Sequence, residues 1–109
     1  MGMVIGRSDI FLVNLDPTFG SEIKKIRPCV IISPDEMNTY LKTVIIAPMT
    51  SVKRGYPTRI ACKFRGKSGE VVLDQIRAID KRRLVKRMGK LNENLQDDLI
   101  DGLFEMFSR

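Results

Sequence analysis

The chain has 109 residues and a net charge of +6, and it contains no histidine. This length suits a single domain, residues 1–109, whose core is large enough to fold without disulfides or a metal. The missing histidine excludes a Ser-His-Asp triad and a paired-histidine ribonuclease. Two cysteines alone make a poor zinc site, so we expect no metal ion and no other cofactor.

Cys29 and Cys62 each lie in an apolar run. This is typical of small core residues in a reduced, intracellular protein, although the sequence leaves open a bridge between them. The first residues lack the basic and apolar segments of a signal peptide, and no run is long enough to cross a bilayer. We therefore expect a cytoplasmic protein that does not interact with a membrane.

Alternating or continuous apolar runs predict five strands, at residues 9–15, 29–33, 43–50, 58–64 and 71–79. The β-branched runs at 29–33 and 43–50 are typical of strands covered on both faces. Pro48 is awkward inside such a strand, so we expect the strand to end or bulge there. Pro34 is expected to begin a short helical turn, and residues 65–70 to form a hairpin turn.

The last part of the chain has a different pattern. Asn92 suits an N-cap, and Glu93 favours the positive end of a helix dipole. Gly102 weakens this helix by about 1 kcal/mol relative to alanine. Strands followed by a closing helix predict a β-rich α+β domain, most simply a small barrel. The apolar residues of the helix fall on one wide face: Leu95, Leu99, Ile100, Leu103, Phe104 and Phe107.

Charge is distributed unevenly. Residues 1–91 hold eighteen Lys and Arg against eight Asp and Glu, whereas residues 92–109 hold one Arg against five acids. A positive body favours an anionic partner, most simply nucleic acid. The six basic residues within 80–90 form either a phosphate-tracking stripe or a solvated edge that protects a strand. The aromatic residues are too sparse for a broad RNA-stacking platform.

The segment "GSEIKKIRP", residues 20–28, sets a carboxylate and three basic residues directly before an apolar strand. Pro28 biases Arg27 to an extended conformation, from which the guanidinium can present its planar fork to a phosphate. Glu22 either pairs with Arg27 or acts as an acid or base. The alternative is a solvated hairpin loop whose ion pair contributes little to stability.

Two further segments, "APMTS" and "VVLDQIR", carry polar groups beside apolar strands. Thr50 and Ser51 either offer hydroxyls to a phosphate oxygen or bond only to local backbone. Asp74 is either the buried partner of a basic residue or a functional carboxylate. Alternation along a strand would place Asp74 on the face opposite Gln75 and Arg77. Without histidine, phosphate chemistry here would need Arg for charge stabilisation and Glu, Asp, Thr or Tyr for proton transfer.

Taken in order, the segments "LDPTFGSE", "RPCVIIS", "TVIIAPMTS", "GYPTRI" and "GEVVLDQIRAIDKRRL" resemble the MazF/PemK (Kid-like) toxins of toxin–antitoxin modules. The resemblance runs from residue 9 to about residue 89. It implies an SH3-like barrel of five to seven strands and a homodimer. It also implies a ribosome-independent endoribonuclease that cuts single-stranded mRNA by attack of the 2′-OH, which leaves a 2′,3′-cyclic phosphate and a 5′-OH. The implied protein partner is an antitoxin with an acidic, partly disordered C-terminal segment.

The resemblance also implies roles for individual residues. Arg27 matches the family's catalytic arginine and Thr50 the threonine that hydrogen-bonds the phosphate, while Glu22 matches a loop acid and Asp74 the base proposed in some members. Ser21 and Val72 depart from the Kid branch, which has His and Arg there, so a scheme based on Arg27 and Thr50 is favoured. The expected substrate-binding residues are Ser21, Lys24, Lys25, Ser51, Lys53, Tyr56, Gln75 and Arg77.

Two other functions stay open at this point. The gyrase-poisoning CcdB toxins share the implied fold, but they act through a C-terminal Trp-Gly-Ile, and this chain ends "EMFSR" without any tryptophan. A non-catalytic barrel that binds RNA or an antitoxin is the other alternative. For an endoribonuclease, the loops at 17–26 and 51–57 are expected to set the cleavage sequence.

Overall fold

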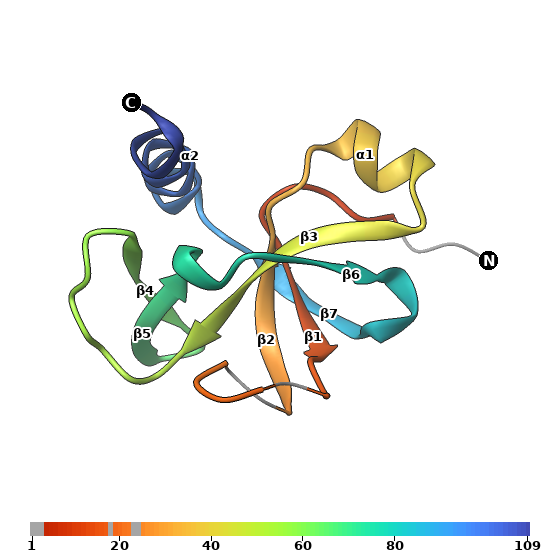
Figure 1. Ribbon diagram of the computed structural model, residues 1–109, viewed down its shortest axis with the longest axis horizontal. Helices are drawn as coiled ribbons and strands as arrows, with labels where there is room; N and C mark the ends of the chain where they lie inside the picture. Colours follow the sequence, from red (N-terminus) through yellow and green to blue (C-terminus); the bar gives the residue numbers. More distant parts are fainter. Residues whose placement is uncertain (1–3, 18, 23–24) are drawn as a thin grey trace.

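The computed structural model describes residues 4–17, 19–22 and 25–109 (Figure 1). The strands are β1 Asp9–Asn14, β2 Ile26–Ile31, β3 Thr43–Thr50, β4 Arg59–Phe64, β5 Lys67–Val72, β6 Arg77–Asp80 and β7 Leu84–Lys90. The helices are α1 Asp35–Tyr40 and α2 Glu93–Phe107, and two 3₁₀ turns are η1 Leu73–Gln75 and η2 Lys81–Arg83. The predicted β-rich α+β fold with a C-terminal helix is confirmed.

Strand β3 lies at the centre of a curled antiparallel sheet. The strand order is β4-β5-β3-β2-β1-β7, and β6 also pairs with β3. β3 changes its neighbour along its length, because β6 pairs with its first half and β5 with Met49 and Thr50. In Figure 1, β4 and β5 lie to one side of β3 and β6 to the other, so the sheet curls around this strand.

The prediction that Pro48 ends or bulges its strand is wrong. Pro48 lies inside β3, opposite Cys29 of β2. The pairing of β3 with β6 stops at Ile46, and the pairing with β5 starts at Met49. Pro48 therefore lies where β3 passes from one neighbour to the next. Its missing N–H is tolerated there because neither the pairing with β6 nor the pairing with β5 includes Pro48.

The predicted strand over residues 71–79 is also wrong, because η1 interrupts it between β5 and β6. β5 instead begins at Lys67 and pairs with β4 through a turn of only two residues, Arg65 and Gly66. Their φ angles are +51° and +79°. Positive φ at both positions is typical of a type I′ hairpin turn, which follows the twist of the two strands. The turn is thus shorter than the predicted 65–70.

Apolar side chains gather in two clusters on opposite faces of the sheet, as alternation along a strand requires. The first cluster, inside the curl, includes Phe11, Cys29 and Ile46. The second, beneath α2, includes Met49 and Leu99. The expectation that the cysteines are core residues holds for Cys29, which is buried, and in part for Cys62, which is half-buried; both are free thiols.

Helix α2 covers the second cluster. Asn92 caps it as predicted, because its side-chain oxygen accepts a hydrogen bond from the N–H of Leu95 at 2.9 Å. Leu99 is fully buried. A Cβ on Gly102 would lie 2.8 Å from Leu73 Cδ1 and 2.9 Å from Ile60 Cδ1. Gly102 thus lets α2 approach the sheet closely, which offsets its low helix propensity.

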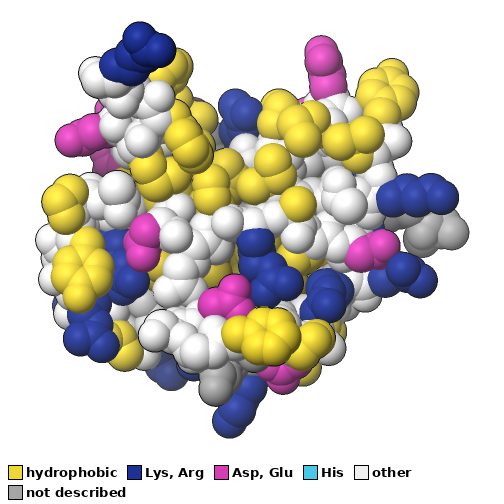
Figure 2. Space-filling model, in the orientation of Figure 1, with side chains coloured by type: hydrophobic (Ala, Val, Ile, Leu, Met, Phe, Trp, Pro, Cys, Tyr) yellow, Lys and Arg dark blue, Asp and Glu magenta, His cyan; other side chains and the backbone are white. Residues whose placement is uncertain are grey.

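The apolar face of α2 is wider than the area that the sheet covers. Phe104 and Phe107 belong to the predicted apolar face, yet their side chains are 72% and 70% exposed. Together with Ile100 and Leu103 they line a shallow groove of about 380 Å³. Figure 2 shows hydrophobic side chains along the inner side of α2, beside the rest of the molecule. Within the described residues, no helix is long and apolar enough to span a membrane.

Candidate active site

Arg27 and Thr50 lie on one face of the sheet. Cys29 of β2 and Pro48 of β3 are partners, so their side chains point to the same face. Arg27 and Thr50 are each two residues from this pair, toward the same end of the antiparallel strands, and alternation returns both to that face. Both residues also line one cavity. The sheet register therefore brings a guanidinium and a hydroxyl together at one end of the curl.

A polar hollow of about 370 Å³ opens on the same face as Pro48. The predicted site residues that it brings together are Ser21, Glu22, Asp74, Gln75 and Arg77, with Leu15, Pro48 and Ile76 completing its walls. The Nη1 of Arg77 donates a hydrogen bond to the Leu15 carbonyl at 3.4 Å. Figure 2 shows acidic and basic side chains side by side between β3 and the β1–β2 loop.

The predicted separation of Asp74 from Gln75 and Arg77 is therefore wrong. The prediction assumed a continuous strand, in which neighbouring side chains point to opposite faces. The η1 turn replaces that alternation with a 3₁₀ geometry between β5 and β6. Asp74, Gln75 and Arg77 consequently line one hollow.

A second cavity, of about 210 Å³, is the one that Arg27 and Thr50 line. Its walls include Met49, Cys62 and Phe64, which pack in the apolar cluster beneath α2. Alternation directs the side chains of Arg27 and Thr50 away from this apolar side. Arg27 and Thr50 line this second cavity, but they share a face of the sheet with Pro48, which lines the polar hollow. We therefore take the candidate active site to be the polar hollow together with Arg27 and Thr50.

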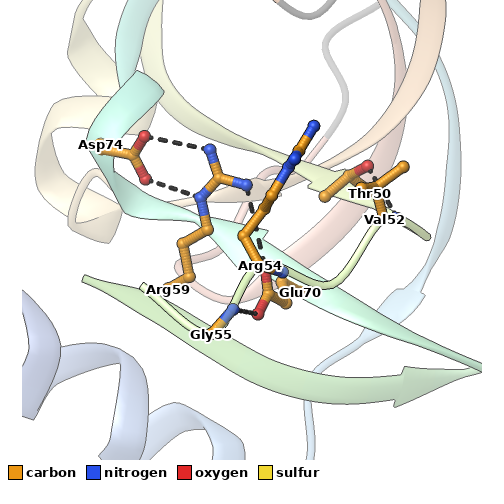
Figure 3. A network of polar contacts seen from close by, with 7 residues as sticks. All are labelled: Thr50, Val52, Arg54, Gly55, Arg59, Glu70 and Asp74. Atoms are coloured by element: carbon orange, nitrogen blue, oxygen red, sulfur yellow. Dashed lines mark hydrogen bonds and ion pairs between the residues drawn. The ribbon is translucent and has the colours of Figure 1, made fainter. Parts of the chain in front are cut away.

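Thr50 ends β3, and its hydroxyl is oriented by the chain that follows. The N–H of Val52 donates to Thr50 Oγ1 at 3.1 Å (Figure 3). This bond uses the oxygen as an acceptor and leaves the hydroxyl proton as the group that Thr50 offers to a ligand. Local backbone bonding, one of the two sequence interpretations, is thus present and is compatible with the other. Ser51, the next residue, is exposed.

The backbone of β5 approaches Thr50 very closely. A Cβ added to Gly69 would lie 2.2 Å from the Thr50 carbonyl oxygen and 3.3 Å from Ser51 Cα. These are backbone atoms, which cannot move aside as the tip of a side chain does. The absence of a side chain at residue 69 therefore fixes how far Thr50 lies from β5.

Asp74 is held by Arg59 of β4. The Nε and Nη2 of Arg59 donate to the two carboxylate oxygens of Asp74 at 3.1 and 3.2 Å. Asp74 is thus the partner of a basic residue, but its side chain is 39% exposed rather than buried. Partial burial alone would raise the pKa of Asp74, but the hydrogen bond and charge of Arg59 outweigh it and lower the pKa. The carboxylate is therefore ionised at neutral pH.

Glu70 lies at the other end of the Arg59 guanidinium (Figure 3). Its Oε1 is 3.7 Å from Arg59 Nη1, and its side chain is 5% exposed. The backbone N–H groups of Arg54 and Gly55 donate to its two oxygens at 3.1 and 2.9 Å. Burial alone would raise the pKa of Glu70, but these two N–H groups and Arg59 together lower it.

The described part of the β1–β2 loop carries the predicted residues Ser21, Glu22 and Lys25, and Lys24 lies outside the described residues. Glu22 Oε1 accepts a hydrogen bond from the N–H of Phe19 at 2.6 Å, which closes a local turn. Lys25 is exposed, and its N–H donates to Asp16 Oδ1 at 2.9 Å. Its φ of +69° turns the chain sharply into β2.

The β3–β4 loop, residues 51–57, is exposed throughout. The guanidinium carbon of Arg59 lies 4.8 Å from the centre of the Tyr56 ring, within the range of a cation–π contact. Lys53 lines a separate hollow beside Asn92, so the structure does not bring this predicted residue into the polar hollow.

Sequence reasoning missed Arg59, Glu70 and Gly69. Glu70 had one usable signal, because a carboxylate directly before the apolar run "VVL" must find partners if its strand is buried. Arg59 and Gly69 carried none, since their roles depend on which strands become neighbours. Across the described ranges, no group of three or more Cys, Asp or Glu side chains is arranged to hold a metal ion.

Residues 6–107 match the family described as PemK-like, MazF-like toxin of type II toxin-antitoxin system. Among solved structures, the chain is similar to MazF from Deinococcus radiodurans, with 24% identity, a TM-score of 0.85, and coverage of 99% of this chain and 100% of that chain. It is also similar to the Mycobacterium tuberculosis toxin MazF-mt6, with 22% identity, a TM-score of 0.77, and coverage of 91% and 95%.

A third similar structure is a mycobacterial endoribonuclease in complex with its cognate antitoxin, with 20% identity, a TM-score of 0.79, and coverage of 93% and 92%. At these identities the solved structures establish the shared fold, and with it the predicted small barrel with a C-terminal helix. The family match spans nearly the whole chain and confirms the resemblance read from the motifs. The chain therefore belongs to the PemK-like, MazF-like toxins of type II toxin–antitoxin systems.

Proposed function

We propose that this toxin is an endoribonuclease that cuts single-stranded mRNA at a short sequence, without the ribosome or a metal ion, in the cytoplasm. The observation that carries the proposal is the face that Arg27 and Thr50 share with Pro48, which lines a polar hollow of about 370 Å³. A guanidinium provides charge and a planar fork for a phosphate, and a threonine hydroxyl provides one more donor.

The reaction that suits these residues takes its nucleophile from the RNA. The 2′ oxygen forms a bond to the adjacent phosphorus while the P–O5′ bond breaks. The 2′ proton passes to a base, the 5′ oxygen gains a proton, and the products are a 2′,3′-cyclic phosphate and a 5′-OH. Arg27 and Thr50 stabilise the charge that grows on the phosphate oxygens. DNA is not cut, because it lacks the 2′-OH.

Proton transfer is assigned to Glu22 rather than Asp74. Both carboxylates line the polar hollow. Asp74 is held by two hydrogen bonds from Arg59, and its lowered pKa makes it a weak base. Its role is therefore to position Arg59 and to bind the substrate with Gln75. Glu22 contacts Phe19 within its own loop, so it can approach the RNA together with that loop.

The test is to incubate the purified protein with a long single-stranded RNA in EDTA and to map the ends of the fragments. We expect 2′,3′-cyclic phosphate and 5′-OH ends, and no cutting of the same sequence as DNA. Arg27→Ala and Thr50→Ala should each lower the rate by about 10²–10³-fold. Arg109→Ala, which changes an exposed arginine outside the hollow, is the matched control. Binding of RNA without cutting would sink the enzyme and favour a binding protein.

The partners that suit this toxin are a second copy of the chain and an acidic antitoxin segment. The exposed Phe104 and Phe107 supply an apolar surface of the kind that a dimer buries. Sedimentation of Phe104→Ser should show a shift from dimer to monomer; a wild-type monomer at micromolar concentration contradicts the homodimer.

A peptide with the antitoxin's acidic C-terminal segment should compete with RNA, and more weakly as salt rises.

A further inference from the structure

Glu70 is a buried carboxylate that lies beside the polar hollow without lining it. Its side chain is 5% exposed, and its position in β5 is directly opposite Thr50 of β3. Burial of a carboxylate is strongly unfavourable unless hydrogen bonds and opposite charge compensate. In Glu70 the compensation comes from two backbone N–H groups and Arg59. These contacts show that the buried charge holds two parts of the structure in place, the β3–β4 loop and the side chain of Arg59.

The first thing that Glu70 organises is the β3–β4 loop. Its two oxygens accept from the N–H groups of Arg54 and Gly55, near the middle of an exposed segment. Gly55 has a φ of +68°, which makes the chain turn back there. The N–H of Arg59 then closes the loop on the Tyr56 carbonyl at 3.0 Å. The β3–β4 loop has no apolar core of its own, and the buried side chain of Glu70 thus fixes its course.

The second thing that Glu70 organises is the orientation of Arg59. The guanidinium uses Nη1 toward Glu70 and Nε and Nη2 toward Asp74 (Figure 3). Its central carbon also lies 4.8 Å from the centre of the Tyr56 ring. If either Glu70 or Asp74 is lost, the plane of the Arg59 guanidinium is no longer fixed. Through Arg59, Glu70 thus links the β3–β4 loop with the carboxylate of Asp74, which lines the polar hollow.

We propose that Glu70 is a positioning residue that holds the 51–57 loop and Arg59 in the arrangement that binds the nucleotide beside the cut, and so sets the affinity and the cut-site selectivity. This inference rests on the proposed endoribonuclease activity. Glu70 lines neither the polar hollow nor the cavity of Arg27 and Thr50, so in the proposed reaction it does not contact the scissile phosphate. Its removal should therefore raise KM and relax selectivity far more than it lowers kcat.

The experiment compares the wild type with Glu70→Gln, which keeps the size but places an amide donor against N–H donors. Glu36→Gln, at an exposed glutamate of α1, is the matched control. Hydrogen exchange of the Arg54 and Gly55 amides is measured by NMR, and cut sites are mapped on one long RNA. In Glu70→Gln we expect exchange at both amides to rise by about tenfold or more and KM by about tenfold, with a broader set of cut sites.

The two ideas fail in different ways. Unchanged exchange at both amides, or unchanged KM and cut sites in Glu70→Gln, overturns the role of Glu70. A wild-type protein that cuts no RNA overturns the proposed function; the role of Glu70 in fixing the loop is then judged by exchange alone. If Glu70→Gln unfolds, Glu70→Asp keeps the charge and withdraws it by one methylene, and the same exchange and KM changes are required of it.

Discussion

Gly69→Ala tests how Thr50 is held in place. Gly69 has no positive φ, so alanine can adopt its backbone conformation and only the added methyl matters. That methyl would lie 2.2 Å from the Thr50 carbonyl oxygen and 3.1 Å from the carbonyl carbon. Ordinary contact begins at 3.4 Å, so the end of β3 must retreat by the difference, about 1.2 Å. Thr50 and its hydroxyl move with it.

A shift of this size is large for the role proposed for Thr50. A misplacement of about 1 Å costs about 10²-fold in rate, and overpacking costs about 1–3 kcal/mol in the free energy of unfolding. For Gly69→Ala we therefore expect kcat to fall by about 10²-fold. Affinity for an RNA with a single 2′-deoxy nucleotide at the cut site should change little, because Arg27 and the polar hollow remain.

The assay combines single-turnover cleavage with thermal unfolding, so that rates are compared only where both proteins are folded. Gly6→Ala is the matched control, because its methyl would have its nearest neighbour, Asp9 Oδ2, at an ordinary 3.4 Å. A folded Gly69→Ala protein that cuts RNA at the wild-type rate refutes the argument that β5 sets the position of Thr50.

Three further predictions concern stability and are measured by chemical unfolding. Gly102→Ala should change the free energy of unfolding by less than about 1 kcal/mol, because the gain in helix propensity offsets close contacts with the side-chain ends of Leu73 and Ile60. Asn92→Ala removes the cap of α2 and should cost about 1 kcal/mol; no loss contradicts the cap. Burial alone would raise the pKa of Asp9, but Arg87 and the Gly6 N–H lower it below 3.8. Its stabilisation is thus present above about pH 4 and lost as pH falls through the folded pKa, so Asp9→Asn should reduce the acid sensitivity of unfolding.

The sequence predicts those parts of the fold that depend on local patterns. Period-two alternation located β1 and β4, and period-four spacing located α2, because each reports which side chains of one segment share a face. The break at η1 and the unbroken β3 at Pro48 could not be predicted in this way. Both depend on which strand lies beside β3 at each point, and neighbouring strands are distant in the sequence.

The same distinction between local patterns and long-range contacts applies to the residues of the candidate site. Arg27 and Thr50 stand out because a proline, a strand end and a resemblance mark them. The bond between Arg59 and Asp74 joins residues fifteen positions apart, and it requires the β4–β5 register that sets Arg59 opposite Val72. The exposure of Phe104 had no signal either, since helical spacing shows a common face but not how much of it the sheet covers.

The hydrogen bonds that fix the β3–β4 loop go to its main chain. Every residue except proline has the N–H that Glu70 requires at position 54, so the side chains of the loop are not needed for its shape. Val52 and Lys53 are exposed and can be exchanged while the loop keeps its course. Such a loop can change what it recognises by single substitutions that leave stability almost untouched. In such a loop, evolution or protein engineering can change specificity without changing the fold.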